Sequence, residues 1–585
     1  DHYLIDRGIL MRTSMLAALL LMLVQPAARA NDGFLFRPLT EMTAASAFGQ
    51  TFASHQYSVG TTVNQRGNLI GYQLTANGQW RSFNITPGTN PALVIVDTPD
   101  FIALAAGEPV CFWIFCSSAL PWGLMLTPEG PVGQFVGRDP LLAPLPGSLP
   151  DSRFPGAFVN ANRSGVVAST QQSDTGQFGA VLFSNGTLTL TDAPWLTAIN
   201  DNVPAQVLAY SGADADCLIA GSGCTPPAST DCHDDGDRHT NTRGKGHQSH
   251  GKGHGYGHYR CGPGKPGSDS YLGINAASEA TATSAVSASA GAGSSLITVS
   301  AEGVISRLQF PSQLASGEGL SRMYPLALNN RTALLRADIH GSSVWPGRLL
   351  RCDFEPLQQD GNADGVVDCL NGLRPVEAPE TGIEVRTVFG FSLNNQGLLI
   401  GNSGFAGAGV GVPFQLNLNQ VVVQADLLAN RLVGAEGWEL GSVSDLNDGR
   451  RAIGHGYLNC ADSAQAVALM PVTALSGNLG FRAGSWLHPA SVAPGQNYAL
   501  APQAKGGSGQ YLYRYSARRA GDSDWALLQD WSTDALQATA SAQNGDVCHR
   551  IELADAQSSE QRELILRMRV GTGLAPATPR LLSPL

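Results

Sequence analysis

Oxygen-bearing side chains recur at every second position in one short stretch of the chain. They are Asp360, Asn362 and Asp364, followed by Gly365 and then Asp368. Calcium takes about six to eight hard oxygen ligands, and a loop supplies them when alternate side chains point inward and a glycine permits a sharp bend. The spacing matches the start of the EF-hand pattern, with Gly365 at the bend. It therefore predicts a calcium loop, inserted over residues 352–372.

The predicted Ca²⁺ ligands are Asp360, Asn362, Asp364, Val366 (through its carbonyl), Asp368 and Asn371. The last position departs from the EF-hand pattern, because Asn371 offers one oxygen where a glutamate would offer two. We therefore expect a structural or weaker site rather than a fast sensor. Similar loops occur in dockerin-like segments, but a dockerin needs two loops and this chain shows one. The alternative is an ordinary Asp-Gly turn without metal.

A second metal candidate lies in a segment rich in histidine and glycine between Cys232 and Cys261. Neutral imidazoles bind Zn²⁺, Cu²⁺ or Ni²⁺, and the candidate ligands are His247, His250, His254 and His258. Their spacing matches no fixed zinc fold. Almost nothing apolar surrounds them, so we expect a disordered insert over about residues 213–270. A low-complexity insertion without a metal role is the favoured interpretation.

The chain contains none of the common catalytic motifs: no G-x-S-x-G, no H-E-x-x-H and no phosphate-binding glycine loop. Single histidines at His340 and His455 are the remaining candidates for a general base. Lone histidines are more often structural, so we assign no catalytic residue.

The composition favours strands and turns over long charged helices. Charged residues make up 14% of the chain, and it contains 68 Gly and 34 Pro. The formal net charge of -11 argues against a nucleic-acid binder, which needs a basic face. A chain of 585 residues is too long for one ordinary core, so we expect several domains.

The N-terminal region predicts export. Met11 and Arg12 precede an apolar run from Met15 to Val24, and Ala28-Arg29-Ala30 forms an A-x-A cleavage pattern. We interpret residues 1–30 as upstream sequence and a bacterial signal peptide, with mature protein from near Asn31. No later run is long enough for a membrane span, so we expect a secreted, periplasmic or cell-surface protein without a transmembrane segment.

The ten cysteines agree with export, because an even number in an exported chain favours disulfides. Plausible local pairs are Cys111–Cys116, Cys217–Cys224, Cys232–Cys261 and Cys352–Cys369. Cys460 and Cys548 are then left over, and spacing alone does not prove the connectivity.

Two hairpin patterns recur along the chain. The first is an apolar residue, Asn, a short polar turn and an apolar stretch that often ends in Gly. Its copies are Val63–Gly71, Ala161–Ser169, Ile274–Ala282, Leu328–Arg336, Leu393–Gly401 and Leu446–Gly454. The second is two apolar stretches joined by a polar turn, at Trp122–Val136, Gly179–Asp192 and Ile297–Phe310, with a truncated relative at Ala466–Val472. Asn and Gly suit such turns because both tolerate left-handed backbone angles.

Two hairpins make a four-stranded sheet, the repeating unit of a β-propeller. We therefore predict a mainly β protein with an irregular β-propeller-like repeat domain over residues 31–480. A series of β-sandwich hairpins is the alternative.

The alternation of "LNNQGLLIG" with "GAVLFSNGTLTL" resembles the bacterial extracellular repeat family named for its His-Ala-Phe signature. The triplet itself is absent, since Gly179-Ala180-Val181 stands at the clearest match. The resemblance covers residues 55 to 475 in patches. It implies an exported propeller-like protein and transfers no catalytic residue.

The last hundred residues look different. Tyr511, Tyr513 and Tyr515 alternate with Leu512 and Arg514, which predicts a strand with the tyrosines on one face. This part resembles small bacterial immunoglobulin-like domains, so we predict a β-sandwich over residues 485–585. A final part of the propeller is the alternative.

Taken together, these features predict an exported, calcium-stabilised, non-enzymatic repeat protein that binds glycan or protein at the cell surface or outside the cell. The alternative is an extracellular polysaccharide lyase or glycoside hydrolase on a propeller scaffold, with an acid/base cluster near His340 or His455.

Overall fold

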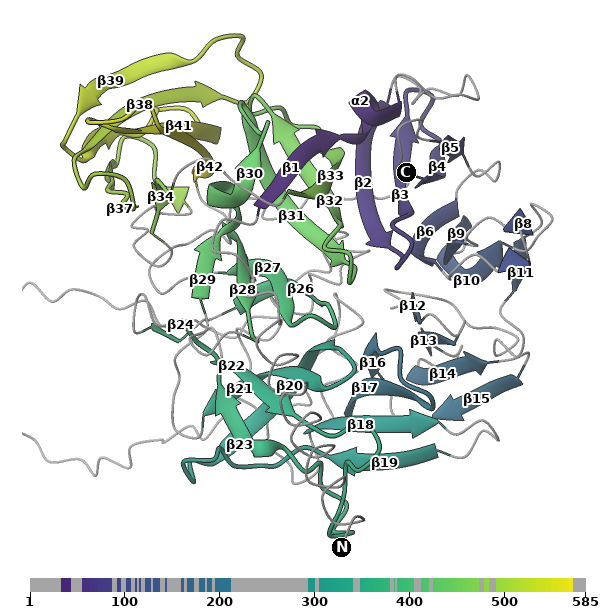
Figure 1. Ribbon diagram of the computed structural model, residues 1–585. Coiled ribbons are helices and arrows are strands. Elements are labelled where there is room, and N and C mark those ends of the chain that lie inside the picture. Colours follow the sequence, from purple (N-terminus) through teal and green to yellow (C-terminus); the bar gives the residue numbers. More distant parts are fainter. Residues whose placement is uncertain are drawn as a thin grey trace, which may run out of the picture.

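The computed structural model consists almost entirely of strands (Figure 1). In the part of the chain that it describes, only α2 (Leu39–Thr43) and the 3-10 helix η1 (Leu428–Arg431) are helical. Neither of these two short segments has the length or the apolar run that a membrane crossing requires. The prediction of a mainly β protein is confirmed. The structure describes residues 33–43, 55–86, 92–95, 101–106, 111–112, 115–116, 121–127, 130–136, 142–144, 159–162, 166–172, 178–184, 187–191, 195–211, 293–299, 305–339, 348–378, 383–384, 387–403, 412–419, 424–472, 478–482 and 491–571.

Four-stranded antiparallel sheets follow one another along the first half of the chain. Sheet 1 contains β2 (His55–Val63), β3 (Leu69–Thr75), β4 (Trp80–Thr86) and β5 (Ala92–Ile95). Sheet 2 contains β6 (Phe101–Ala106), β9 (Pro121–Thr127), β10 (Gly130–Val136) and β11 (Leu142–Pro144). Sheet 3 contains β12 (Val159–Ala161), β13 (Val167–Gln172), β14 (Phe178–Ser184) and β15 (Thr187–Thr191). Sheet 4 contains β16 (Trp195–Ile199), β17 (Ala205–Ser211), β18 (Gly293–Val299) and β19 (Ile305–Gln309).

The same arrangement continues in the second half. Sheet 5 contains β20 (Leu320–Leu328), β21 (Thr332–Ile339), β22 (Arg348–Asp353) and β23 (Leu370–Pro375). Sheet 6 contains β26 (Thr387–Leu393), β27 (Leu398–Ser403), β28 (Val412–Asn417) and β29 (Gln424–Leu427). Sheet 7 contains β31 (Trp438–Leu446), β32 (Ala452–Leu458), β33 (Gln465–Val472), the N-terminal strand β1 (Gly33–Pro38) and β30 (Leu432–Val433). Two connections carry two-stranded pairs: β7 (Cys111–Phe112) with β8 (Phe115–Cys116) between β6 and β9 of sheet 2, and β24 (Glu377–Ala378) with β25 (Ile383–Glu384) between sheets 5 and 6.

Each sheet packs against the next, and the order of contacts closes on itself. In Figure 1 the sheets follow one another around the molecule from purple through teal to green. Sheet 7 packs on sheet 1, where the Ser58 amide donates to the Ala464 carbonyl at 2.9 Å. β1 pairs antiparallel with β33, so strands from both ends of the repeat region share sheet 7.

The apolar core lies in the spaces between neighbouring sheets rather than in one central layer. Leu208 of sheet 4 packs with Leu335 of sheet 5, and Phe83 of sheet 1 packs with Ile453 of sheet 7. β3 is buried on both faces for this reason, which explains its continuous apolar sequence.

The first predicted hairpin pattern is confirmed at five of its copies, those that begin at Val63, Ala161, Leu328, Leu393 and Leu446. Its terminal glycine permits close approach of the neighbouring strand. A Cβ at Gly71 would lie 2.1 Å from the Val59 carbonyl oxygen, and one at Gly454 would lie 2.0 Å from that of Ser442. The second pattern is confirmed at β9–β10, β14–β15 and β18–β19.

The asparagine of each turn joins its sheet to the next one. In five cases its Nδ2 donates to the backbone carbonyl of the equivalent asparagine: Asn162 to Asn200 at 3.0 Å, Asn200 to Asn329 at 3.3 Å, Asn329 to Asn394 at 2.8 Å, Asn394 to Asn447 at 3.1 Å and Asn447 to Asn64 at 2.8 Å. All six asparagines are buried. Their Oδ1 atoms accept amide N–H groups of their own turns, as Asn394 does from Leu398. These side chains therefore satisfy buried backbone groups of two sheets at once.

The sequence pattern missed one of these turns. The copy at Ile274–Ala282 lies outside the described residues. Asn200 occupies the equivalent turn of sheet 4, between β16 and β17. The signal was weak because this turn is longer: the Asn200 amide donates to the Gln206 carbonyl, whereas the Asn394 amide donates to the Leu398 carbonyl four residues on.

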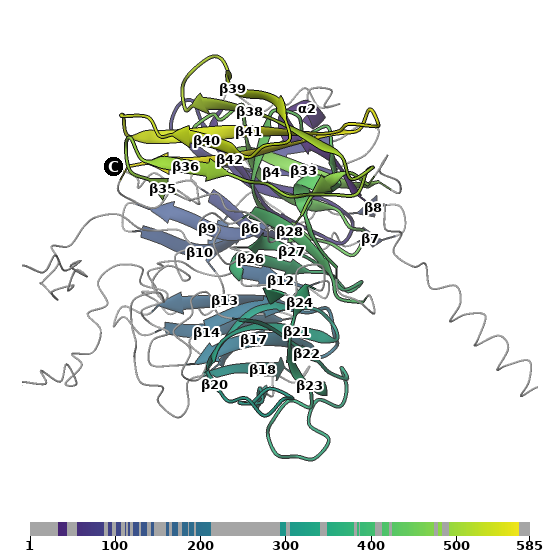
Figure 2. The same ribbon diagram turned by 90° about the vertical axis from the view of Figure 1, so that its left-hand side faces the viewer.

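The C-terminal residues form a separate set of sheets, yellow in Figures 1 and 2. The largest, which we call the C-terminal sheet, has the order β35 (Ser491–Val492), β42 (Gln561–Val570), β41 (Gly545–Asp555), β38 (Tyr511–Arg519) and β39 (Ala526–Ser532). Two small sheets accompany it: β36 (Asn497–Leu500) with β40 (Leu536–Thr539), and β34 (Gly480–Phe481) with β37 (Ala504–Lys505). Tyr513 and Tyr515 lie in the core between them and Tyr511 packs against it, which confirms the predicted tyrosine face.

Candidate calcium loop and its surroundings

The candidate calcium loop connects β22 and β23 of sheet 5. The Cys352–Cys369 disulfide spans its base, with a Cα–Cα distance of 5.0 Å, and confirms that predicted pair. Asp353, at the end of β22, accepts from Arg351 at 2.8 Å and from Arg374 of β23 at 2.9 Å. The two strands that carry the loop are thus held together covalently and by charge-assisted hydrogen bonds.

The aspartates fold the loop by accepting its backbone N–H groups. Asp360 accepts from the amides of Asp364 and Gly365, both at 3.0 Å. Asp368 accepts from the Gly361 amide at 2.6 Å, and Asp364 accepts from the Val366 amide at 2.8 Å. Asn362 also accepts from the Asp364 amide, at 3.1 Å. Four of the predicted side-chain calcium ligands therefore lie within one compact turn.

Backbone angles of the left-handed region make this turn possible. Gly365 has φ +78°, which glycine adopts without cost, and Ala363 has φ +59°. The sequence prediction that Gly365 provides the bend is confirmed.

The loop is also attached to the neighbouring sheet. The Gln309 amide at the end of β19 donates to the Gly365 carbonyl at 2.9 Å, and the Val367 amide donates to the Gln309 carbonyl at 2.8 Å. The Val366 carbonyl, between these two bonds, receives no hydrogen bond from the described residues. An ion held by the loop would therefore stiffen the contact between sheets 4 and 5.

Asn371, the sixth predicted ligand, stands apart from the other five. It lies on β23, beyond the disulfide, with φ +65° and an exposed side chain. No hydrogen bond between described residues joins its side chain to the aspartates. Water would have to supply the ligand at this position.

The donor set fits a hard cation. It contains only carboxylate, amide and carbonyl oxygens, and a carboxylate oxygen that accepts one N–H retains a second lone pair. Within the described ranges, however, no three His, Cys, Asp or Glu side chains gather into a metal-binding group. Calcium would thus need Asn362, Val366 and water in addition to the aspartates. Calcium binding stays a prediction, with the hydrogen-bonded Asp-Gly turn as the alternative.

His455 is buried in β32, with 4% of its surface exposed. Its Nδ1 lies 3.1 Å from Ser442 Oγ, and burial lowers the pKa of its imidazole to about 4. A neutral, enclosed ring of this kind fits a structural role. His340 and the histidine candidates His247, His250, His254 and His258 lie outside the described residues.

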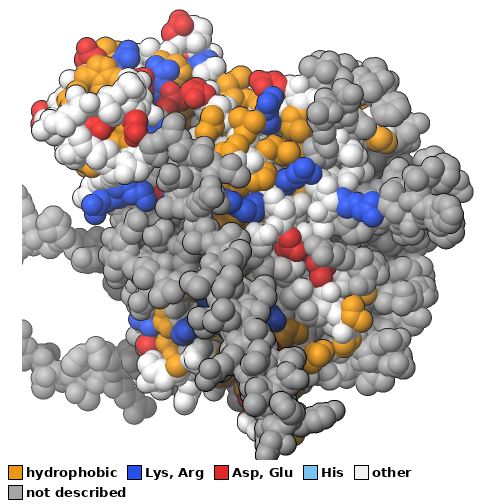
Figure 3. All heavy atoms as spheres, in the orientation of Figure 1, with side chains coloured by type: hydrophobic (Ala, Val, Ile, Leu, Met, Phe, Trp, Pro, Cys, Tyr) orange, Lys and Arg blue, Asp and Glu red, His pale blue; other side chains and the backbone are white. Residues whose placement is uncertain are grey.

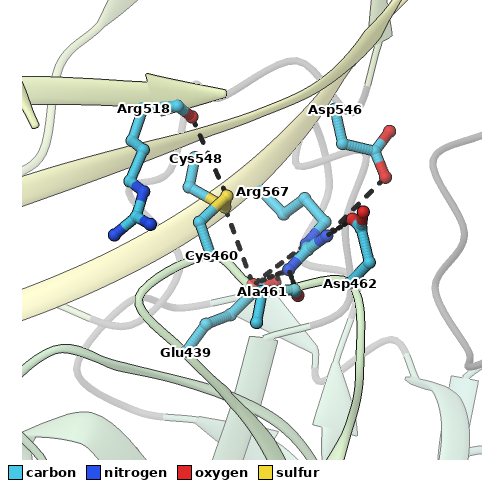
Figure 4. Close-up of a disulfide and its surroundings, with 8 residues drawn as sticks. All are labelled: Glu439, Cys460, Ala461, Asp462, Arg518, Asp546, Cys548 and Arg567. Atoms are coloured by element: carbon cyan, nitrogen blue, oxygen red, sulfur yellow. Dashed lines mark hydrogen bonds and ion pairs between the residues drawn. A yellow bond between two sulfur atoms is a disulfide. The ribbon is translucent and has the colours of Figure 1, made fainter. Parts of the chain in front are cut away.

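A buried charge cluster between sheet 7 and the C-terminal sheet was not predicted (Figure 4). Arg567 donates to Glu439 at 3.0 Å and to the Ala461 carbonyl at 2.8 Å, and its guanidinium stacks on the Tyr457 ring at 4.7 Å. The Cys460–Cys548 disulfide lies beside this cluster and joins the two cysteines that the local pairs had left over. We call this region the junction.

The junction groups satisfy one another. The side chains of Arg567 and Glu439 are only 8% and 12% exposed, and Asp546 lies 3.7 Å from the guanidinium. Burial raises the pKa of Glu439, although Arg567 pulls it the other way. The sequence signal was an arginine within the apolar alternation of "LILRMRV", which marks a charge that needs a partner.

No family model matches the sequence, and the comparison with curated proteins finds no match either.

Proposed function

We propose that this protein is an exported, calcium-stabilised binding protein without enzymatic activity. In this proposal the repeat region is a seven-bladed β-propeller, and the C-terminal sheets form an immunoglobulin-like β-sandwich. The scaffold presents a surface that binds glycan or protein at the bacterial cell surface or outside the cell.

The order of sheet contacts supports the propeller. Six four-stranded sheets and one five-stranded sheet pack in sequence order, and sheet 7 packs on sheet 1. The pairing of β1 with β33 resembles the way in which a radial array closes, because it completes the last sheet with the first strand. The Asn-containing turns also support the resemblance to the His-Ala-Phe repeat family, and we include that resemblance in the proposal.

The observation that carries the calcium role is the attachment of the Asp360–Asp368 loop to both sheet 4 and sheet 5. A cation that gathers its oxygens would hold two adjacent sheets in place. A ligand that binds only the folded state raises the free energy of unfolding, by about 2.7 kcal/mol at a hundredfold excess over Kd.

The test is a thermal melt of the mature protein in chelator and then in calcium. We expect calcium to raise the melting temperature of the wild type and of the Asp534→Ala control, but not that of Asp364→Ala. Asp534 is an exposed aspartate whose side chain makes no hydrogen bond to described residues. Equal calcium responses in all three proteins would refute the calcium role.

The disulfides support export. Both disulfides that the described residues contain are of the kind that persists in oxidising compartments. The predicted signal peptide lies outside the described residues. Expression of the full chain in a bacterium should yield exported protein that begins near Asn31, which N-terminal sequencing can check; retention of residues 11–30 would contradict this.

A further inference from the structure

One face of the C-terminal sheet carries three arginines in a small area. Arg514 and Arg518 belong to β38, and Arg550 lies on β41 next to it. Arg514 is opposite Glu552 and Arg518 is opposite Cys548 in the antiparallel register. On β41, Arg550 lies midway between Cys548 and Glu552, two positions from each. Its side chain is therefore on the same face as Arg514 and Arg518 and is diagonal to both. Tyr513, Tyr515 and Ile551 occupy the other face, in the core.

These groups have hydrogen-bond donors that lack acceptors. The Nε atoms of Arg514, Arg518 and Arg550 are buried without a partner, and so is the indole Nε1 of Trp525. Arg518 also makes no ion pair with any described residue. Arg567 and Arg519 differ, because acceptors surround their guanidinium groups. Buried donors normally form hydrogen bonds, so four donors without one in a single cluster need an explanation.

The same cluster contains an acceptor that also lacks a hydrogen bond. Glu552 Oε2 lies 3.7 Å from Arg514 Nε and 3.9 Å from Arg550 Nε, which suits an ion pair but is too long for a hydrogen bond. It has no hydrogen-bond partner either. Arg550 stacks on the Trp525 ring at 4.9 Å, which fixes its position.

The cluster opens to the surface at one end. The side chain of Arg514 is 36% exposed, and Asp530, 3.8 Å from it, is 75% exposed. Figure 3 shows basic and acidic side chains next to one another over the C-terminal sheet, at upper left. A ligand can therefore reach Arg514 directly and reach the deeper donors as the long arginine side chains turn.

We propose that this arginine cluster binds an acidic sugar through its carboxylate or sulfate group. The planar guanidinium groups match an oxyanion, and the sugar hydroxyls can donate to Glu552 and Asp530. A bare anion would leave Glu552 unpaired, and a nucleic acid would need a row of cations rather than one cluster. The proposal rests on the proposed binding role, whose ligand class it names, and not on the calcium loop.

The experiment measures binding of the full mature chain, in chelator, by titration calorimetry. The probes are an oligogalacturonate, a sulfated dextran, neutral dextran, poly-glutamate and inorganic sulfate. The variants are Arg518→Gln and Arg514→Gln. The control is Arg519→Gln, which loses the same charge on the same strand but whose side chain already donates to Gln543 and Asn544. A thermal melt confirms that each variant is folded.

We expect an acidic sugar to bind the wild type, and each cluster variant to weaken binding about tenfold or more, since hydrogen bonds between charged groups are among the strongest in proteins. Arg519→Gln should change the affinity less than about twofold, within the range of ordinary surface substitutions. Equal losses in Arg519→Gln would overturn the proposal, and so would equal binding of sulfate alone or of poly-glutamate. Binding of neutral dextran without arginine dependence would also overturn it, while the proposed binding role would stand. No binding by any sugar would overturn this site, and the calcium melt would judge the scaffold separately.

Discussion

The two disulfides of the described chain hold regions with opposite chemistry. Cys352–Cys369 has a sequence separation of 17 and closes an exposed loop within sheet 5. Cys460–Cys548 has a separation of 88 and joins sheet 7 to the C-terminal sheet, with both cysteines fully buried. In the loop, carboxylates accept backbone N–H groups. At the junction, a carboxylate and a carbonyl surround one guanidinium.

This difference suggests that the loop serves ligand binding, whereas the junction serves the stability of the fold. The loop carboxylates are exposed or half-buried and keep lone pairs that a cation can use. The junction charges are buried and paired with one another, so they have little left for a ligand. A buried pair of this kind adds little net stability, but removal of one partner is costly. We therefore expect substitutions in the loop to change calcium binding, and substitutions at the junction to change the free energy of unfolding.

The largest expected effect is loss of the junction disulfide. The double substitution Cys460→Ala and Cys548→Ala should lower the free energy of unfolding by about 4 to 5 kcal/mol, because it frees a long loop in the unfolded chain. Denaturant titration under non-reducing conditions measures this change. A loss no larger than that of the loop pair would contradict the assignment of the junction as the main tether.

The loop disulfide should matter less for stability and more for calcium. Cys352→Ala with Cys369→Ala should cost about 3 kcal/mol in chelator, since the loop is shorter. The same change should weaken calcium binding, because the ion must then order a freer loop. Calorimetry with calcium tests this, with the junction double variant as control. An unchanged calcium affinity would show that the disulfide does not organise the ligands.

Acid should lower the free energy of unfolding through His455, which lies in sheet 7 next to the junction. The pKa of His455 is lowered to about 4, so the unfolded chain takes up a proton first as the pH falls from about 6.5. The stabilisation is complete above that pH and is lost toward pH 4, by about 2 to 3 kcal/mol. His455→Gln should remove this part of the pH dependence, as measured by denaturant titrations between pH 7 and pH 4. Parallel curves for variant and wild type would contradict the burial effect.

Local signals in the sequence predicted much of the fold. Asn-containing turns and the glycine at Gly71 define hairpins within a few residues, and the hairpins are present. The packing of sheet 7 on sheet 1 and the pairing of β1 with β33 involve residues more than 400 positions apart, for which a single sequence has no local signal. The sequence predicted the asparagines only as turn residues, but their side chains also donate hydrogen bonds to the adjacent sheet.

In the candidate site, too, the sequence predicted local contacts but not contacts between distant segments. Asp360 to Asp368 form one compact turn because all their contacts are local. The attachment of the loop to Gln309 and the pairing of Arg567 with Glu439 join distant segments, so the sequence alone did not predict them. The disulfide at Cys352 was predicted from proximity, whereas Cys460 and Cys548 remained only as the two cysteines left over.

The smallest predicted effect tests whether the two regions communicate. Asn394 of sheet 6 lies between them: it accepts the Leu398 amide and bonds to Asn447 of sheet 7, and Asn329 of sheet 5 bonds to it. Asn394→Ala should cost about 2 kcal/mol, since it leaves buried backbone groups unpaired. The exposed Asn419→Ala control should cost about 0.5 kcal/mol or less.

The informative measurement is hydrogen exchange of sheet 7 with and without calcium. If the asparagine bonds link the sheets into one cooperative unit, calcium should protect sheet 7 in the wild type and in Asn419→Ala, and protect it less in Asn394→Ala. Protection confined to sheets 4 and 5 in all three proteins would show that the loop and the junction act independently. The asparagine bonds would then stabilise each pair of sheets without coupling distant ones.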